Sequence, residues 1–410
     1  MYKNKKFLFT LLIVVLSQLS FSQNNTNSPY TRFGFGDISD NSSGALKSMA
    51  GVSIGSRSIS NINSVNPASY SAVDSMTFMF DVGANALYSR FSQTAGSSSK
   101  WNSNLEYITM QFPLTKWLGF SAGLQPYSYS GYNFQLNGQH LERRFEADSI
   151  INYYQNFSGG GGFNQTYLGA SAKFLNHISV GVNSYYMFGS VYNNRSNRFE
   201  NSADSVTESN SIKSKNFRMR YGVQFYNTFA NSHEAVLGFI YEPKTKLTGD
   251  FSSVFNGDTT TVTGFETAEM LGVGAYYTFD KKLSVGMDYT LQNWGDALYF
   301  GNKNTLTNRS KLALGAEYQP NMRGRNYFQR IKYRAGVNFS NSYIKVNGVN
   351  PADNMSLTLG FGLPLRNTNT ILNTTFEYGK VGSTSILRED FFKFTFNVLF
   401  NEHWFFKRKL

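Results

Sequence analysis

The chain has 410 residues, of which 16% are charged, 16% are aromatic and none is cysteine, and its formal net charge is +12. Because an average soluble domain carries about 25% charged residues, this chain is poor in charge, and it is too aromatic to be intrinsically disordered. The lack of cysteine excludes disulfides, thiolate metal sites and a cysteine-linked lipid anchor.

The first residues have the pattern of an export signal. Three lysines within the first six residues precede an apolar run over 7–16, and small serines at 20 and 22 follow it. A positive start, a short apolar stretch and a small-x-small site are typical of a secretory signal peptide. The apolar run is about half of the ~20 residues that a membrane-spanning helix needs. We predict a signal peptide over 1–22.

Residues 23–76 precede the first predicted strand and are rich in Asn, Ser and Gly. Apolar side chains nevertheless recur through this stretch, which a disordered tail would not need. The residues after 76 predict a barrel of about fourteen strands, described below, and such a barrel is wide enough to hold a folded insert. We therefore expect residues 23–76 to form a hatch, or plug, inside the lumen.

The rest of the chain alternates with period two. Over residues 355–363, Met, Leu, Leu, Phe and Leu alternate with Ser, Thr, Gly and Gly, and residues 283–291 repeat the pattern. A soluble sandwich would alternate too, but the polar faces carry the Gly, Ser, Thr and charges of a barrel lumen. The predicted fold is all-β: a transmembrane antiparallel β-barrel over 77–400. The fourteen predicted strands are 77–91, 104–113, 117–135, 163–175, 178–192, 214–229, 234–248, 263–279, 282–295, 305–319, 329–345, 353–364, 370–382 and 388–400.

The connections between these strands alternate in length. Short turns are expected at 115–116, 176–177, 231–233 and 280–281, and long polar loops at 136–162, 193–213 and 249–262. Bacterial outer-membrane barrels have short periplasmic turns and long extracellular loops. We therefore predict the outer membrane of a Gram-negative bacterium, with both mature termini in the periplasm. The connection 320–328, with Arg323 and Arg325, is unexpectedly long for the short-turn side.

Charged side chains occupy the predicted inward faces. They can form a solvated or mutually paired lumen, or an anion-attracting pore. The candidates are Glu106, Lys173, Arg218, Arg220, Asp288, Lys311, Glu317, Lys332, Arg334, Glu377 and Lys393.

Short motifs resemble the FadL-type outer-membrane transporters. Asn66, Pro67 and Ala68 stand just before the first strand, after a small-residue run over 49–53, and residues 162–169 and 179–183 resemble that family's fourth and fifth strands. The resemblance implies passive uptake of hydrophobic, fatty-acid-like compounds past a hatch. It also implies lateral exit through a gap beside a kinked third strand.

Pro126 lies inside the predicted third strand. Proline cannot donate to a strand ladder and therefore marks an edge, a bulge or a break. A closed barrel has no edge, so we expect either a local opening of the wall or a harmless bulge at this position.

Two other functions stay open at this point. The aromatic-basic tail over 401–410 fits an accessory barrel subunit of a larger outer-membrane complex for protein export or barrel insertion, and it also fits an interfacial girdle. A polar-solute porin is a third alternative, which an intact hatch disfavours. The predicted partners are outer-membrane lipid, an apolar small molecule, and outer-membrane or periplasmic proteins.

Enzymatic chemistry is not indicated. The four histidines fall on a predicted loop, two turns and the tail, without metal-ligand spacing, and no nucleophile lies beside a convincing base. We expect no enzyme, no cofactor, no metal, no catalytic residue and no nucleic-acid partner.

Overall fold

The computed structural model describes residues 25–403 apart from 95, 143–148, 176, 201–204, 231, 347–352, 367–368 and 385. The predicted signal peptide over 1–22 and residues 404–410 of the predicted tail lie outside the described residues. Among the described residues, no helix is long and apolar enough to cross a membrane.

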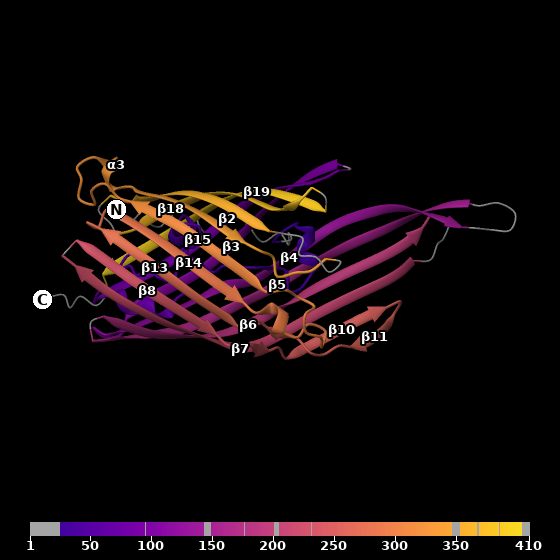
Figure 1. The fold of residues 1–410 in the computed structure, drawn as a ribbon, viewed down its shortest axis with the longest axis horizontal. Coiled ribbons are helices and arrows are strands. Elements are labelled where there is room, and N and C mark those ends of the chain that lie inside the picture. The colour runs from indigo at the N-terminus through magenta and orange to yellow at the C-terminus, as the bar shows by residue number, and fades with distance from the viewer. Residues whose placement is uncertain are drawn as a thin grey trace, which may run out of the picture.

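Fourteen antiparallel strands form a closed barrel, because β19 pairs with β2 and β13 pairs with β8 (Figure 1). The predicted fold class and number of strands are thereby confirmed. The wall strands are β2 (Thr77–Gln93), β3 (Gly96–Pro113), β4 (Leu118–Glu142), β5 (Ser149–Phe174), β6 (Ile178–Phe199), β7 (Ser205–Phe229), β8 (His233–Glu242), β13 (Met270–Phe279), β14 (Leu283–Gln292), β15 (Arg309–Tyr318), β16 (Lys332–Ser340), β17 (Asn354–Pro364), β18 (Ile371–Ser383) and β19 (Leu387–His403).

The wall has its apolar side chains on the outside. In β17, Met355, Leu357 and Leu359 are about half exposed, whereas Ser356 and Thr358 between them are only 1% exposed. A soluble sandwich would bury the apolar row instead, so this inversion excludes it. An apolar outer band over a polar inner face is the pattern of a barrel in the outer membrane.

Shorter elements complete the fold. The N-terminal segment, defined here as residues 25–76, holds η1 (Pro29–Arg32), β1 (Asp37–Ile38), α2 (Gly44–Lys47) and η2 (Pro67–Ala72). The other short elements are β9 (Thr245–Lys246), β10 (Gly249–Phe255), β11 (Asp258–Thr261), β12 (Glu266–Thr267), η3 (Trp294–Asp296) and α3 (Tyr327–Arg330).

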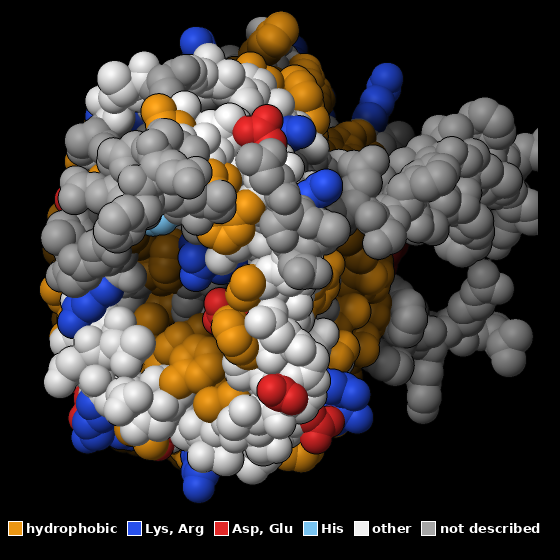
Figure 2. Space-filling view, turned by 90° about the vertical axis from the view of Figure 1, so that its right-hand side faces the viewer, with side chains coloured by type: hydrophobic (Ala, Val, Ile, Leu, Met, Phe, Trp, Pro, Cys, Tyr) orange, Lys and Arg blue, Asp and Glu red, His pale blue; other side chains and the backbone are white. Residues whose placement is uncertain are grey.

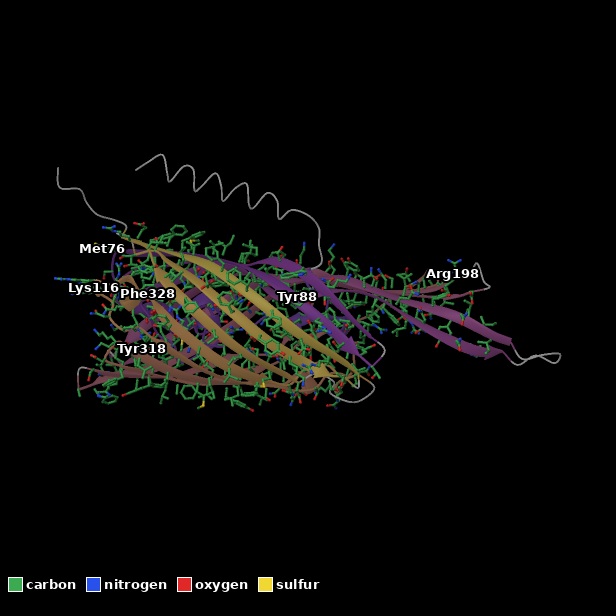
Figure 3. All side chains as sticks on the ribbon, turned by 90° about the horizontal axis from the view of Figure 1, so that it is seen from above. Met76, Tyr88, Lys116, Arg198, Tyr318 and Phe328 are labelled. Atoms are coloured by element: carbon green, nitrogen blue, oxygen red, sulfur yellow. The ribbon has the colours of Figure 1, made fainter. Side chains whose placement is uncertain are left out.

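The two ends of the barrel differ. Met76, Lys116, Tyr318 and Phe328 lie at the end that we call the short-turn end, and Arg198 lies on hairpins that project from the opposite, long-hairpin end (Figure 3). His403 pairs with Thr77, so the last described residues are at the short-turn end.

The prediction of long loops over 136–162 and 193–213 is wrong, because most of these residues continue the wall strands. Strands β4 and β5 extend to residues 142 and 149, and β6 and β7 extend to 199 and 205, as paired antiparallel ladders. Beyond the membrane both faces of these strands meet water, so the one-sided hydrophobic alternation that marks wall strands is lost. The predicted loop over 249–262 contains the β10–β11 hairpin, which pairs with β7.

Candidate functional site: the barrel interior

The N-terminal segment is bonded to the inner wall in widely separated sectors of the ring. Tyr70 Oη donates to Asn183 Oδ1 of β6 at 2.9 Å. Asp288 Oδ2 of β14 accepts the backbone N–H groups of Ser53 at 2.5 Å and Ile54 at 2.7 Å. Because β6 and β14 stand far apart in the strand order, a segment that reaches both of them lies inside the ring.

The Asn66-Pro67-Ala68 motif builds the helical turn η2 that touches the wall. Asn66 Oδ1 caps the turn by accepting Ala68 N–H at 3.1 Å, and its Nδ2 donates to Ile54 O at 2.8 Å. Pro67 is the first residue of the turn, where a missing N–H costs nothing. Ala68 O accepts Ser179 Oγ of β6 at 2.6 Å, so the motif fastens the N-terminal segment to the barrel.

Inward-facing glycines let the two layers approach closely. A Cβ built on Gly181 would lie 2.5 Å from the carbonyl carbon of Pro67, and one on Gly222 would lie 2.1 Å from Asn66 Oδ1. Any larger residue at these two positions would push η2 away from the wall.

Aromatic residues fill the interior toward the long-hairpin end. Phe35 of the N-terminal segment is 1% exposed and lies 5.7 Å from Trp294 and 5.4 Å from Tyr299, measured between ring centroids. Tyr299 Oη also donates to Gly34 O at 3.0 Å. Further buried members of this cluster are Ile38, Tyr127, Phe163, Met187, Val191, Ile212, Leu247, Phe251, Phe265, Leu306, Tyr343 and Ile344.

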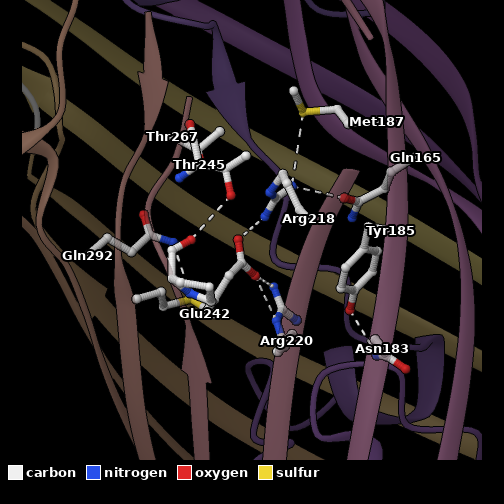
Figure 4. Close-up of polar contacts among 12 residues, drawn as sticks. Gln165, Asn183, Tyr185, Met187, Arg218, Arg220, Glu242, Thr245, Thr267 and Gln292 are labelled. Atoms are coloured by element: carbon white, nitrogen blue, oxygen red, sulfur yellow. Dashed lines mark hydrogen bonds and ion pairs between the residues drawn. The ribbon is translucent and has the colours of Figure 1, made fainter. Parts of the chain in front are cut away.

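Arg218, Arg220 and Glu242 form a buried ionic cluster on β7 and β8 (Figure 4). Arg218 pairs with Glu242 Oε1, and Arg220 Nη2 lies 2.9 Å from Glu242 Oε2. Arg218 also lies over the Tyr127 ring at 4.4 Å and donates to Gln165 Oε1 at 3.1 Å. All three charged side chains are less than a tenth exposed, so each depends on the others for neutralisation.

The remaining predicted lumen charges are largely matched by acids. Arg334 Nε lies 2.6 Å and Lys332 Nζ 3.3 Å from the Glu317 carboxylate. Lys393 Nζ lies 3.4 Å from Glu377 Oε2. Lys173 is half-buried near the end of β5, where its backbone N–H donates to Trp117 O.

Lys311 pairs with the N-terminal segment. Its Nζ lies 2.6 Å from Asp40 Oδ2, and Arg309 Nη2 lies 3.7 Å from Asp40 Oδ1. Enclosure by protein alone would raise the pKa of the Asp40 carboxyl, but these two cations hold that pKa below its ordinary value. The charge of Asp40 therefore helps to bind the N-terminal segment to β15.

Two interior cavities lie between the N-terminal segment and the wall. One measures about 220 Å³ and has Asp37, Asp40, Lys47 and Lys393 in its lining; the other measures about 80 Å³ and adjoins Arg218. Figure 2, which looks onto the long-hairpin end, shows a hollow with basic, acidic and hydrophobic side chains around it. Both cavities carry charged groups, unlike the mostly apolar sites that bind fatty or aromatic ligands.

Pro126 lies where the wall changes its pairing. The β3–β4 ladder ends at the pair Ile108 and Leu124, and the register of β4 with β5 shifts between Pro126 and Ser128. Beyond this point β1 of the N-terminal segment pairs with β4, through Ile38 and Ser128.

The N-terminal segment also bridges β3 and β4 beyond the point where their ladder ends. Asn27 Nδ2 donates to Asn102 Oδ1 of β3 at 2.6 Å, and Asn104 Nδ2 donates to Asn25 O at 2.8 Å. On the other side, Gly131 N–H of β4 donates to Thr31 Oγ1 at 3.1 Å. The break in the β3–β4 ladder is therefore spanned by residues 25–31.

Glu242 and Asp40 are interior acids that were not predicted from the sequence. A signal existed for Glu242, because it has the same inward parity in β8 as Val236 and Ile240. Asp40 lies in a segment without periodicity, so its pairing with Lys311 had no signal in the sequence.

Solved structures share this fold. The CymD monoaromatic hydrocarbon channel has a TM-score of 0.57 at 14% identity, covering 90% of this chain and 99% of that chain. A FadL homologue of Pseudomonas aeruginosa has a TM-score of 0.57 at 13% identity, covering 90% and 99%. The toluene transporter TbuX of Ralstonia pickettii has a TM-score of 0.57 at 13% identity, covering 88% and 98%. The predicted resemblance to FadL-type barrels is confirmed at the level of the fold, and CymD and TbuX are named as a channel and a transporter, not as enzymes.

Among curated proteins, none matches the sequence. The model of one protein family, described as BamG, matches residues 1–410, which is the whole sequence. The chain therefore belongs to the BamG family.

Proposed function

We propose that this protein is an outer-membrane barrel held closed by its N-terminal segment, and that it serves as an accessory subunit of a larger outer-membrane complex for protein export or barrel insertion. In this proposal the short-turn end faces the periplasm. The observation that carries the proposal is the way the N-terminal segment is bonded to the wall: Ser171 of β5, Asp288 of β14 and Thr375 of β18 each accept or donate a hydrogen bond that anchors it.

A static closed lumen is favoured by the density of these bonds. Asn183 Nδ2 donates to Ser64 O at 3.0 Å, and Gln224 Nε2 donates to both Ile54 O and Ser56 O at 3.1 Å. Moving the N-terminal segment would leave such buried polar groups unpaired, at about 1–3 kcal/mol for each group that water does not satisfy. A hatch that opens for every molecule of cargo would have to overcome several of these costs together.

A surface for protein partners exists beyond the wall. Strands β4 to β7 have 22 to 26 residues, whereas about 9–11 residues suffice to cross a membrane. Their outer parts, with β10 and β11, form a projecting sheet (Figure 1). In the described residue-by-residue ladders β11 is paired with β10 alone, so this sheet ends in an edge that another strand can join.

A second candidate function is uptake of a hydrophobic small molecule, and the break in the β3–β4 ladder favours it. Passage would require the N-terminal segment to move away from the wall as a whole, including residues 25–31 between Asn102 and Gly131, after which cargo would exit sideways beside Pro126. The similar structures named for toluene and monoaromatic hydrocarbons suggest aromatic rather than fatty-acid cargo for this candidate.

Disulfide locks separate the two functions, because the chain has no cysteine of its own. Ser71 and Ser179 hydroxyls lie 2.7 Å apart, and Ser48 and Thr375 hydroxyls lie 2.5 Å apart on the opposite side of the ring. In each pair the two side chains already face each other in contact, so cysteines at these positions need only a small movement to form the ~2.05 Å S–S bond. The variants S71C/S179C and S48C/T375C would each fasten the N-terminal segment to the wall when oxidised, and the four single-cysteine variants are the controls.

We expect oxidised and reduced forms of both locked variants to co-purify with the same proteins in the same ratio. Uptake of labelled toluene, by cells whose outer membrane lacks another channel of this fold, should not respond to oxidation. Uptake that stops on oxidation and returns with a reductant would contradict the subunit proposal and support the channel.

A further inference from the structure

The connection between β15 and β16, residues 319–331, is unlike the other connections at the short-turn end. The turns at 115–116 and 280–281 are tight, whereas this connection contains α3 and stands out from the rim of the barrel (Figure 1). It exposes Met322 by 74% and Phe328 by 67%. Exposed apolar groups of this size on a folded loop mark a contact surface.

Internal hydrogen bonds give this connection a defined shape. Asn321 N–H donates to Gln329 O at 2.8 Å, and Gln319 Nε2 donates to Arg330 O at 2.8 Å. Asn326 Oδ1 caps α3 by accepting Phe328 N–H at 3.1 Å, and Tyr333 Oη donates to Phe328 O at 3.1 Å. The exposed side chains are therefore presented by an ordered framework.

The connection is basic and lacks acids. Residues 319–331 contain Arg323, Arg325 and Arg330 and no Asp or Glu. Arg330 lies over the Tyr327 ring at 5.4 Å. Arg323 and Arg325 are exposed, and within the described chain neither guanidinium has a carboxylate within 4.0 Å. Two unneutralised guanidinium groups that are two residues apart in the chain are suited to a phosphate.

An apolar groove begins directly below this connection on the outer wall. The connection leaves the wall after Tyr318 and returns to it before Tyr333, and these two residues are paired at the rim. Two residues below them, Ala316 pairs with Ala335. The groove measures about 710 Å³, and its lining includes Ala235, Ala275 and Leu357 as well. Small alanines between larger neighbours hollow the wall where a straight apolar chain can lie.

We propose that the 319–331 connection and the groove beneath it form a binding site for one anionic phospholipid. Arg323 and Arg325 bind the lipid phosphate, Met322 and Phe328 enter the headgroup boundary, and an acyl chain occupies the groove. This site goes beyond the proposed function, because it applies equally to a subunit and to a channel.

A lipid fits these features better than a protein partner. The apolar part of the site is continuous with the lipid-facing wall, where Leu357 and Met287 are about half exposed. The charged part lies just above it, at the level where polar headgroups begin. Charge above and hydrocarbon below is the order of groups along a phospholipid.

The test uses the purified mature barrel in detergent and native mass spectrometry, with titration of phosphatidylglycerol and of phosphatidylcholine with the same acyl chains. The charge variant is R323Q/R325Q. Its matched control is K116Q/R366Q, which removes two exposed cations from other turns of the same rim. The groove variant is A335F, and unchanged heat-dependent mobility on gels verifies that each variant is folded.

Phosphatidylglycerol should bind one molecule per barrel more tightly than phosphatidylcholine. R323Q/R325Q should weaken phosphatidylglycerol binding about thirtyfold, since it removes two cations and each cation near a lipid surface contributes about 1 kcal/mol. A335F should weaken both lipids, and K116Q/R366Q should change neither. Equal binding of the two lipids to the unaltered protein, or equal losses in R323Q/R325Q and K116Q/R366Q, would overturn the proposal. The proposal would also be overturned if R323Q/R325Q released a bound protein and left lipid binding unchanged.

Discussion

Deleting residues 25–73 should turn a closed barrel into an open pore. In our proposal the N-terminal segment closes the barrel, since it is bonded to inner-wall residues of both β6 and β14, and a fourteen-strand ring without it is wide enough for water and ions. We expect single-channel conductance in planar bilayers to rise on the order of tenfold or more over the intact protein, because a water-filled barrel of this size conducts freely.

A milder variant provides the same test if the deletion variant does not insert into the bilayer. Asp288→Ala removes the acceptor of the Ser53 and Ile54 N–H groups and should produce brief openings. Asp250→Ala, an exposed aspartate on β10 outside the wall, is the matched control and should leave the conductance unchanged. Deletion and Asp288→Ala proteins that both conduct no better than the intact barrel would show that the N-terminal segment is not what closes it.

Replacing Glu242 with alanine should be the most destabilising single change in the wall. The substitution leaves Arg218 and Arg220 buried without their common acid, and breaking a buried pair in this way costs about 3–5 kcal/mol. The free energy of unfolding can be measured by urea titration of the barrel in lipid vesicles, with tryptophan fluorescence as the signal.

Lys282→Ala provides the comparison for Glu242→Ala. Lys282 pairs with Asp280 at 2.5 Å, but both side chains are about half exposed, and such surface pairs contribute about 0–1 kcal/mol. Glu242→Gln should fall between the two variants, since it retains hydrogen bonding without the charge. Equal losses for Glu242→Ala and Lys282→Ala would mean that water reaches the arginines and that the cluster does not organise this part of the interior.

The wall was predictable from the sequence because a membrane imposes a simple rule on it. Each wall strand must be apolar toward lipid and can be polar toward the lumen, which gives the clean alternation of β14 and β17. Most predicted boundaries of these strands fall within a few residues of the observed ones. The large errors in β3 to β7 occur where the strands leave the membrane and the rule ceases to apply. Strands β8 and β13 are instead shorter than predicted, because β8 ends at residue 242 and β13 begins at residue 270.

The β10–β11 hairpin, which was predicted to be a loop, had a local signal in the sequence. Asn256 and Gly257 both have positive φ, at 46° and 96°, and join β10 to β11. An Asn-Gly pair between β-forming residues is a strong hairpin indicator. The prediction of a polar loop over 249–262 did not take this Asn-Gly pair into account.

The interior was only partly predictable. Charged residues such as Arg218 and Lys311 were identified by their inward parity, but parity does not say which acid each of them meets. The acid that pairs with Lys311 is Asp40, which stands some 270 positions earlier in the chain. The close contact of Gly181 with Pro67 is likewise a property of two folded layers, and the alternation of one strand contains no information about it.

Native mass spectrometry of the protein, extracted gently from its own outer membrane, tests most directly whether this closed barrel acts within an assembly. We predict one barrel with protein partners in a fixed ratio, and with phospholipid as its only small-molecule adduct. A barrel without protein partners that carries a hydrocarbon or a fatty acid would contradict the account and establish the protein as a channel for that compound.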